Sequence, residues 1–419
     1  MKQIDVTVIG GGPGGLAAAI AAKKAGSEVL LIEREARLGG ILKQCIHDGF
    51  GLMRFHEKLS GPEYVERFIA EFHSLGIPSE ILTFVTKIER KEKLFEITYV
   101  NQKGVSSVCS KTIVLATGCR ERTAKQVFIH GTRPAGVFTA GTAQHMVNLQ
   151  GIMPAQKCVI LGSGDIGLIM ARRLTMEGAE VLGVYEAKST PSGLTRNLVQ
   201  CLDDFGIPLH LSTTVTRVFG ADRLEAVEIS KVDEQMHPIP GTEERIDCDA
   251  LILSVGLIPE NEIAESIGTE MDRRTKGPSV DETLMTNVPG VFVCGNALHV
   301  NDLVDYVSES GETAGSAAAA YDGSEHACIR MDADQSLLYL VPQRILKADP
   351  QNQPITIYFR TSKPMEKARF VIMDGNKEVF SRAFSHLRPP EMQRLILPGN
   401  LDGLRQSSTL NVMLQEVAE

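Results

Sequence analysis

Residues 5–26 read DVTVIGGGPGGLAAAIAAKKAG. An apolar, strand-like run ends in a glycine-rich turn, and an alanine-rich, helix-like run follows directly. Gly10, Gly12 and Gly15 have the spacing that closes a tight turn, admits a pyrophosphate to the backbone and packs a helix against a strand. The start of the helix adds unpaired N–H groups and a positive dipole end. The stretch therefore predicts a strand–turn–helix unit that binds a dinucleotide.

An acidic residue completes this unit, and the whole pattern occurs twice. The next strand-like run ends at Glu33, whose carboxylate can bind both hydroxyls of an adenosine ribose. A second copy follows with Gly162, Gly164 and Gly167, and its acid is Glu186. Two copies predict two nucleotide cofactors that exchange electrons. A carboxylate at Glu186 repels a 2′-phosphate, which favours NAD over NADP, although Lys188 nearby adds a positive charge.

The composition of the chain indicates a globular protein and argues against several classes of function. A chain of 419 residues, 43% hydrophobic and 23% charged, predicts two or three globular domains. The net charge of −9 disfavours nucleic acid as a partner. The eight cysteines are scattered, so no metal site is predicted. No apolar run approaches a membrane span, and the first strand starts at residue 5, so a cytoplasmic protein is expected.

Three further stretches follow in a characteristic order: TIVLATG at 112–118, DALILSVGLIPENEIAE at 249–265 and NVPGVFVCGNALH at 287–299. With the two glycine motifs, they resemble the pyridine nucleotide-disulfide oxidoreductase superfamily of flavoproteins, which includes thioredoxin reductase, glutathione reductase and NADH oxidases. The resemblance spans roughly residues 4 to 325. It implies an α/β fold with two Rossmann-like domains of three-layer ββα type, in which an NAD-type domain is inserted into a split FAD domain.

The expected boundaries are 1–120 and 281–330 for the two FAD-binding segments, 121–280 for the inserted domain and 333–419 for a small β-sandwich-like domain. The last domain is expected from alternating apolar and polar residues and from a DGN hairpin turn at 374–376. Docking of a partner or capping of the flavin domain is its expected role.

The resemblance also assigns cofactor residues. It implies that Glu33 and the first glycine turn hold the adenosine and pyrophosphate of FAD, that Val85 meets the adenine and that a helix opening near Ser310 points at the flavin. Asn296 stands where most relatives have aspartate, and its amide can still bond a ribityl hydroxyl. The expected FAD-binding residues are Gly10, Gly12, Pro13, Gly14, Gly15, Glu33, Arg34, Gly39, Gly40, Val85, Thr117, Gly118, Gly295, Asn296 and Ser310. The residues expected to bind NAD, or another adenine nucleotide, in the inserted domain are Gly162, Gly164, Gly167, Glu186 and Gly256.

A narrower resemblance comes from GGILKQCIHDGFGL, ATGCRER, GTRPAGVFTAGTAQ, LGSGDIGLIMARRL and CGNALHVNDLVDYVSESGE. These stretches are similar to FAD-dependent oxidoreductases described beside glycerol-3-phosphate dehydrogenase. They are also similar to the alpha-type subunits of opine oxidase, sarcosine oxidase, hydrogen cyanide synthase and dye-linked proline dehydrogenase. The resemblance implies a subunit that works with a second flavoprotein, in a homo- or hetero-oligomer.

Cys45, His47 and His299 are the candidate catalytic residues. Disulfide reductases need two closely spaced cysteines, and only Cys45 follows Gly39-Gly40, so a reductase of that kind is not expected. Cys45 is either a reactive thiolate assisted by His47 or a packed thiol, and a metal ligand is the weaker alternative. His299 either accepts a proton during hydride transfer or orients the next helix, for which Asp302 is expected to be the N-cap.

Three functions remain in competition. The first is an FAD-dependent dehydrogenase that oxidises a small amine, amino acid or polyol and passes electrons to a partner, a quinone or NAD. The second is an NADH-dependent flavin reductase that serves a partner protein. The third is a nucleotide-binding subunit without turnover, in which NAD or another adenine nucleotide fills the second site.

Overall fold

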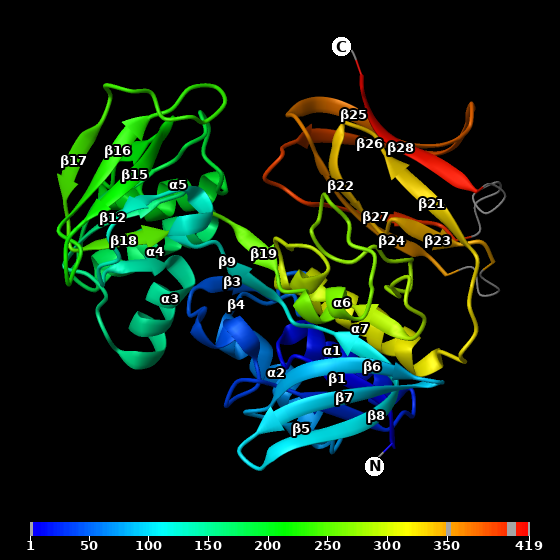
Figure 1. The fold of residues 1–419 in the computed structure, drawn as a ribbon. Coiled ribbons are helices and arrows are strands. Elements are labelled where there is room, and N and C mark those ends of the chain that lie inside the picture. Colours follow the sequence, from blue (N-terminus) through cyan, green and yellow to red (C-terminus); the bar gives the residue numbers. More distant parts are fainter. Residues whose placement is uncertain (1–2, 349–352, 400–407, 418–419) are drawn as a thin grey trace. The chain divides into compact units, whose positions relative to one another are not determined.

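The computed structural model describes residues 3–348, 353–399 and 408–417 (Figure 1). The chain divides into two compact units. The first unit contains Met1–Lys43, Asp48–Cys119 and Pro259–Glu419, as far as these are described, and the second contains Gln44–His47 and Arg120–Ile258.

The first unit is built on a seven-stranded sheet around the strand of the opening motif. This strand, β1 (Gln3–Ile9), pairs in parallel with β2 (Val29–Ile32) and with β8 (Gly104–Leu115). The sheet order is β5-β2-β1-β8-β7-β6, and β20 (Val291–Val293) also pairs with β8. All four residues of β2 are buried, as expected of a strand covered on both faces. The other strands are β5 (Ser79–Glu80), β6 (Phe84–Lys91) and β7 (Leu94–Asn101).

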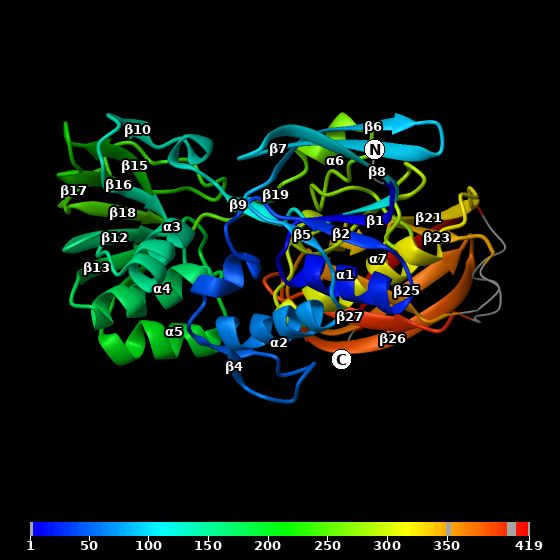
Figure 2. The same ribbon diagram turned by 90° about the horizontal axis from the view of Figure 1, so that it is seen from below.

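Two helices of the first unit pack through glycine. Helix α1 (Pro13–Lys24) lies beside α7 (Val304–Ala320) (Figure 1 and Figure 2). A Cβ at Gly311 would collide with the carbonyl oxygen of Gly14, and one at Gly315 with that of Ala18. The start of α7 is therefore held close to the glycine turn, although the two segments are far apart in the sequence.

Apart from α2 (Gly61–Ser74), the remaining elements of the first unit that precede its C-terminal strands are short. Ser60 and Glu63 form a reciprocal capping box at the start of α2. The others are β3 (Asp48–Phe50), β4 (Leu59–Ser60) and α6 (Glu262–Ser266). The strands β9 (Cys119–Glu121) and β19 (Leu257–Pro259) lie where the chain leaves and re-enters the first unit.

The second unit repeats the same strand–turn–helix arrangement. Its parallel sheet has the order β11-β18-β12-β13-β14, and a four-stranded sheet has the order β10-β15-β16-β17. The parallel strands are β11 (Val137–Thr139), β12 (Lys157–Leu161), β13 (Glu180–Tyr185), β14 (Leu209–His210) and β18 (Ala250–Leu253). The others are β10 (His130–Gly131), β15 (Thr213–Phe219), β16 (Ala226–Lys231) and β17 (Glu244–Asp247). The helices are α3 (Ala140–His145), α4 (Asp165–Met176) and α5 (Thr195–Cys201).

The C-terminal residues form two sheets around one core, which we call the C-terminal β domain. Its predicted hairpin is confirmed, because Asp374 pairs with Lys377 across Gly375 and Asn376. The five-stranded sheet contains β21 (Cys328–Ala333), β23 (Arg344–Leu346), β25 (Met365–Asp374), β26 (Lys377–Leu387) and β28 (Thr409–Glu416). The three-stranded sheet contains β22 (Leu337–Val341), β24 (Ile355–Thr361) and β27 (Gln393–Leu397).

The second unit ends at Ile258, whereas the inserted domain is expected to end at residue 280. Residues 259–280 therefore belong to the first unit. Asn261 explains this placement, because its Nδ2 donates to the carbonyl oxygen of Ala297 at 2.8 Å. The C-terminal β domain also belongs to the first unit and begins its first strand at Cys328. Both boundaries depend on contacts between residues that are far apart in the sequence, and no local sequence pattern indicates such contacts.

Two expectations about α7 are wrong. The helix begins at Val304 rather than near Ser310, and Ser310 is buried in its second turn. Asp302 is not its N-cap: Leu303 takes that position without a side-chain cap. The carboxylate of Asp302 is instead bonded to the C-terminal β domain.

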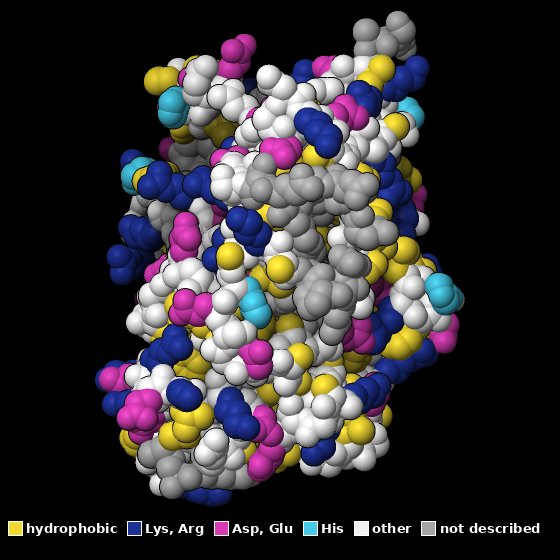
Figure 3. Space-filling view, turned by 90° about the vertical axis from the view of Figure 1, so that its right-hand side faces the viewer, with side chains coloured by type: hydrophobic (Ala, Val, Ile, Leu, Met, Phe, Trp, Pro, Cys, Tyr) yellow, Lys and Arg dark blue, Asp and Glu magenta, His cyan; other side chains and the backbone are white. Residues whose placement is uncertain are grey.

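Acidic and basic side chains are interspersed over the described part of the face in Figure 3. No helix in the described part of the chain is both long enough and apolar enough to cross a bilayer.

Candidate nucleotide-binding and redox site

In the first glycine turn, two glycines have no room for a side chain, whereas a third has room for a Cβ atom. A Cβ at Gly10 would collide with the carbonyl oxygen of Ala116, and one at Gly15 with that of Gly10. Gly12 differs, because a Cβ there would meet only the Cα of Gly40, at 3.8 Å. The space beside Gly12 and the first-turn N–H groups of α1 together suit a pyrophosphate.

Gly39 and Gly40 close the other side of this turn. The N–H of Gly39 donates to the carbonyl oxygen of Gly11 at 2.8 Å. A Cβ at Gly40 would lie 2.9 Å from the Cα of Gly12, and both residues of the pair have positive φ angles. Glycine is therefore required at Gly39 and Gly40.

Glu33 lies at the end of β2 with its carboxylate turned to the glycine turn. Its two oxygens accept hydrogen bonds from the N–H groups of Gly11, at 2.6 Å, and Glu35, at 2.7 Å. A carboxylate has about four lone-pair positions, so acceptor capacity remains for ribose hydroxyls. Val85 is buried in β6, and nearby Thr83 donates its N–H to the carbonyl oxygen of Glu33 at 3.0 Å. The predicted adenosine-binding residues are thus brought together.

The second unit repeats this geometry. The carboxylate of Glu186 accepts from the N–H of Ser163 at 3.1 Å and from that of Lys188 at 3.1 Å, as Glu33 does from Gly11 and Glu35. Ser163 also donates its hydroxyl to Glu186 at 2.6 Å. A Cβ at Gly164 would meet only the hydroxyl of Ser254, at 3.8 Å, whereas one at Gly167 would lie 2.5 Å from the carbonyl oxygen of Gly162. Both predicted turns therefore share one plan.

Chain segments from outside the motifs complete the first site. Thr117 donates its hydroxyl to the carbonyl oxygen of Glu260 at 2.6 Å, and Glu260 donates its N–H to the carbonyl oxygen of Gly118 at 2.9 Å. The carboxylate of Glu260 holds the guanidinium of Arg34 at 2.8 and 3.1 Å, which raises the pKa of Arg34. In the second unit, Gly256 accepts from the N–H of Arg122 at 3.1 Å and has a φ of 100°.

The turn at Gly295–Asn301 carries the other predicted flavin contacts. Ser310 accepts a hydrogen bond from the N–H of Gly295 at 2.9 Å and so anchors this turn to α7. The side-chain oxygen of Asn296 accepts from the N–H of Asn301 at 3.0 Å. Its amide nitrogen donates to the sulfur of Cys119 at 3.6 Å. Ser310 thus acts on the turn from inside the helix rather than from its N-terminus.

Cys45 lies in the short segment of the second unit that follows a 3-10 helix, Gly40–Gln44. Its sulfur is 3.8 Å from Oε1 of buried Gln144. Burial raises the pKa of the Cys45 thiol to about 12, so at neutral pH it is a thiol rather than a nucleophilic thiolate. This environment favours the packing interpretation. His47 lies in the same segment and is half-buried.

His299 is only 1% exposed. Its ring centroid lies 5.6 Å from that of Tyr339 and 5.3 Å from that of Tyr358, both in the C-terminal β domain. Burial lowers the pKa of His299 to about 3, and the charge of Arg360 acts in the same direction. A neutral ring enclosed by two tyrosines favours the structural alternative over proton transfer with a substrate.

Sequence reasoning missed Glu260, Asn301 and Arg360. Glu260 stands between Pro259 and Asn261 in the stretch that carries the resemblance, yet nothing in its spacing indicates an ion pair with Arg34. Arg360 comes from a region without a recognised polar motif. Among the described residues, no three His, Cys, Asp or Glu side chains form a group that could hold a metal ion.

Comparison with known proteins agrees with the resemblance found in the sequence. A family model described as pyridine nucleotide-disulphide oxidoreductase matches residues 4–320. The hydrogen cyanide synthase subunit HcnB of Pseudomonas protegens is 27% identical over 318 residues, which cover 70% of this chain and 66% of that protein. An opine oxidase subunit of Agrobacterium tumefaciens is 24% identical over 311 residues, covering 70% and 61%. The chain thus matches less than two thirds of the length of each.

Among solved structures, thioredoxin reductase of Lactococcus lactis superposes with a TM-score of 0.64 at 21% identity. The match covers 76% of this chain and 98% of that one. At this identity the likeness concerns the fold alone, and it confirms an α/β fold like that of flavoproteins with two Rossmann domains.

A substitution at Gly12 tests cofactor binding without disturbing the fold. We expect Gly12→Val to fold, because its φ of −76° suits any L-residue and a side chain there has room, but to lose FAD because the side chain fills the pyrophosphate space. Gly15→Val should instead destabilise the protein by roughly 1–3 kcal/mol or more, because it overpacks the turn. The flavin-to-protein absorbance ratio and the melting temperature measure the two effects. A yellow Gly12→Val protein would contradict the assignment.

Cys45→Ser should keep close to wild-type flavin reduction, because a buried, protonated thiol contributes packing rather than chemistry. Stopped-flow reduction of the flavin measures this, and circular dichroism verifies the fold. A large loss of reduction rate in a folded Cys45→Ser protein would show that the thiol takes part in the reaction.

His299 should make folding acid-sensitive. Its folded pKa of about 3 lies below its ordinary value of 6.5, so between these values only the unfolded state takes up the proton. Lowering the pH from about 7.5 to about 5.5 should therefore reduce the free energy of unfolding of the wild type by roughly 1 kcal/mol more than that of His299→Leu. Urea unfolding followed by tyrosine fluorescence measures this, and equal losses would contradict it.

Proposed function

Because the chain belongs to the pyridine nucleotide-disulphide oxidoreductase family, we propose that it is an FAD-dependent oxidoreductase that works without a redox-active disulfide. The carrying observation is the glycine turn of the first unit, in which a Cβ at Gly12 would meet only the Cα of Gly40, at 3.8 Å, while Glu33 retains free acceptor capacity. Binding of FAD and NAD(P) is typical of this family.

The residues of the first unit fit FAD. The turn around Gly12, closed by Gly40, would hold the pyrophosphate, and Glu33 would hold the adenosine ribose. Asn296 would meet the ribityl chain, and the N-terminal end of α7 would favour negative charge on the pyrimidine ring. Bound FAD would supply a hydride acceptor and donor. The chain's own part is to bind, orient and shield it.

NAD is the nucleotide that best suits the second unit. The carboxylate of Glu186 is only 7% exposed and already holds three hydrogen bonds from Ser163 and Lys188. A 2′-phosphate placed beside it would meet a negative charge, whereas a free 2′-hydroxyl could donate to it. The exposed amine of Lys188 is bonded to Ser192 at 3.3 Å.

Three cysteines are buried in surroundings that keep their thiols protonated. Burial raises the pKa of Cys45, Cys158 and Cys294 to about 12, which supports electron transfer that does not use these thiols. We propose that hydride from a small amine, amino acid or polyol reaches the flavin, and that electrons leave to a partner flavoprotein, a quinone or NAD. HcnB and the opine oxidase relative are both named as subunits, which supports a partner for this chain as well.

An NADH-dependent flavin reductase is the second candidate. The similar arrangement of Glu186 and Glu33 favours it, because a second turn built on the same plan suits a second nucleotide that exchanges electrons. The burial of His299 also agrees with this function. A flavin reductase oxidises no organic substrate, so it needs no proton acceptor at the position of His299. A nucleotide-binding subunit without turnover is the remaining alternative.

Anaerobic titration with NADH separates these functions. We expect NADH to bleach the visible flavin band of the wild type, and NADPH to do so more slowly because of Glu186. The matched variant is Gly164→Val, whose φ of −66° and open surroundings tolerate a side chain. It should remain yellow but lose bleaching by NADH.

No bleaching of the yellow wild type would contradict the role of NADH and leave reduction by an organic substrate. Equal bleaching of the wild type and Gly164→Val would contradict the assignment of the second glycine turn. A purified wild type that retains no FAD after reconstitution would contradict the proposed function itself.

A further inference from the structure

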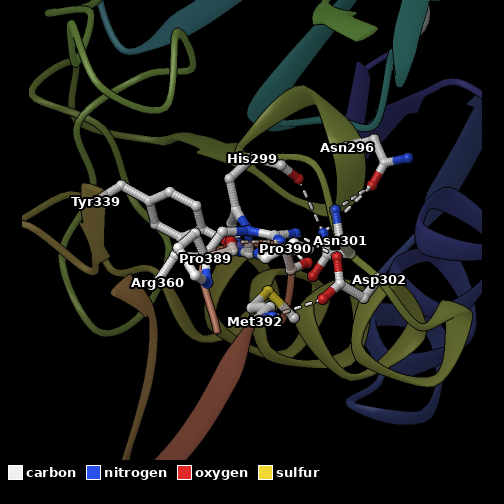
Figure 4. A network of polar contacts seen from close by, with 9 residues as sticks. All are labelled: Asn296, His299, Asn301, Asp302, Tyr339, Arg360, Pro389, Pro390 and Met392. Carbon is white, nitrogen blue, oxygen red and sulfur yellow. Dashed lines mark hydrogen bonds and ion pairs between the residues drawn. The ribbon is translucent and has the colours of Figure 1, made fainter. Parts of the chain in front are cut away.

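A chain of polar contacts leads from the expected flavin contact Asn296 into the C-terminal β domain (Figure 4). Asn301 donates to the side-chain oxygen of Asn296 through both its backbone N–H, at 3.0 Å, and its amide, at 3.3 Å. The same amide donates to the carbonyl oxygen of His299 at 2.9 Å. The turn is thus closed on itself, and its last residue precedes Asp302.

Asp302 is the point at which the turn is tied to another domain. One carboxylate oxygen is bonded to the guanidinium of Arg360, and the other accepts from the N–H of Met392 at 2.6 Å. Both groups belong to the C-terminal β domain. Helix α7 has no side-chain N-cap. The bonds of Asp302 therefore hold the start of the helix in place of a local capping residue.

Arg360 is itself held from several sides. Its Nε donates to the hydroxyl of Tyr339 at 3.0 Å, and its guanidinium also donates to the carbonyl oxygen of Pro390. Its side chain is 14% exposed. A largely buried guanidinium with this many partners has a defined position, and it transmits that position to Asp302.

A second contact repeats the arrangement farther along α7. Glu309 accepts from Nε of Arg394 at 2.8 Å and from the hydroxyl of Tyr358 at 2.5 Å. The ring of Tyr358 lies 5.7 Å from that of Tyr306 on α7 and 5.3 Å from that of His299. The C-terminal β domain therefore contacts the turn and the first part of α7 through charge and through aromatic packing.

We propose that Arg360 is a positioning residue for the cofactor: through Asp302 it holds the turn Gly295–Asn301 and the start of α7 where the flavin requires them. This inference rests on the proposed function, because it assumes that Asn296 meets FAD. It assigns the C-terminal β domain to the cofactor site rather than to partner docking alone. The physical reason is that α7 begins without a side-chain cap, so the bonds of Asp302 to the C-terminal β domain are what fix the chain between the turn and the helix.

The domain has other attachments, so loss of Arg360 should not detach it. Arg274 donates to the carbonyl oxygens of Ala333, at 2.9 Å, and Leu337, at 2.9 Å. Arg344 donates to those of Ser279, at 3.1 Å, and Met285, at 3.3 Å. These contacts join the C-terminal β domain to residues 279–285 and to Arg274 without involving the turn.

The test compares Arg360→Gln with the control Arg369→Gln in the same domain. Arg369 pairs with Glu378 at 2.6 Å and contacts Ser381 at 2.7 Å, all within the C-terminal β domain. We expect Arg360→Gln to bind FAD on the order of tenfold more weakly, as for residues that orient the direct ligands of other cofactors. Its flavin midpoint potential should also shift. Arg369→Gln should match the wild type, and Arg360→Lys should recover part of the affinity.

Hydrogen exchange in the FAD-free protein gives a readout that needs no cofactor. Amides of residues 295–306 should exchange faster in Arg360→Gln than in Arg369→Gln, while those of β24 stay protected. If Arg360→Gln does not fold, Asp302→Asn supplies the same comparison, because it removes the charge from the other partner. Unchanged exchange, or unchanged FAD affinity, in the folded variant would overturn the inference.

The two proposals fail in different ways. A wild type that binds no FAD would refute the proposed function and, with it, the cofactor role of Arg360. A yellow wild type together with unchanged exchange in Arg360→Gln would refute only the positioning role. Equal effects of Arg360→Gln and Arg369→Gln would also refute it, since a general loss of stability would then explain both.

Discussion

The close approach of backbone to backbone at the first glycine turn is the constraint on which the rest of the first unit depends. Gly15 lies against the carbonyl oxygen of Gly10, and Gly311 lies against that of Gly14. The first contact allows helix α1 to pack closely against the end of strand β1, and the second allows α7 to pack closely against α1. No residue with a side chain could occupy these positions without separating the elements.

This packing brings together groups that are far apart in the chain. Once α7 lies on α1, the turn at Gly295 is anchored by Ser310 and lies in the same unit as Gly12 and Glu33. The residues expected to hold FAD therefore come from distant parts of the chain that lie in the same unit. The C-terminal β domain adds Arg360 and Arg394, whose partners Asp302 and Glu309 are next to and on α7.

The two glycine turns are built on the same plan. Glu33 and Glu186 each accept an N–H from the glycine turn and another from two residues farther along the chain. The difference lies in Ser163, whose hydroxyl adds a third hydrogen bond to Glu186. Glu33 therefore keeps more unused acceptor capacity than Glu186 does. Both carboxylates are almost fully buried, so these bonds also compensate the cost of removing the charges from water.

The sequence by itself determined both glycine turns, their acids and the family, because these features depend on neighbouring residues. Glycine spacing, strand and helix patterns and a strand-end acid are all local, and the DGN hairpin is local as well. The true start of α7, the burial of His299 and the partners of Asp302 were decided by the tertiary structure alone. Each depends on contacts across long stretches of chain, such as Asp302 with Arg360 or His299 with Tyr339 and Tyr358. An aspartate before an apolar run suits a helix cap locally, but an ion pair with a distant arginine competes for the same carboxylate, and only the folded chain shows which partner it meets.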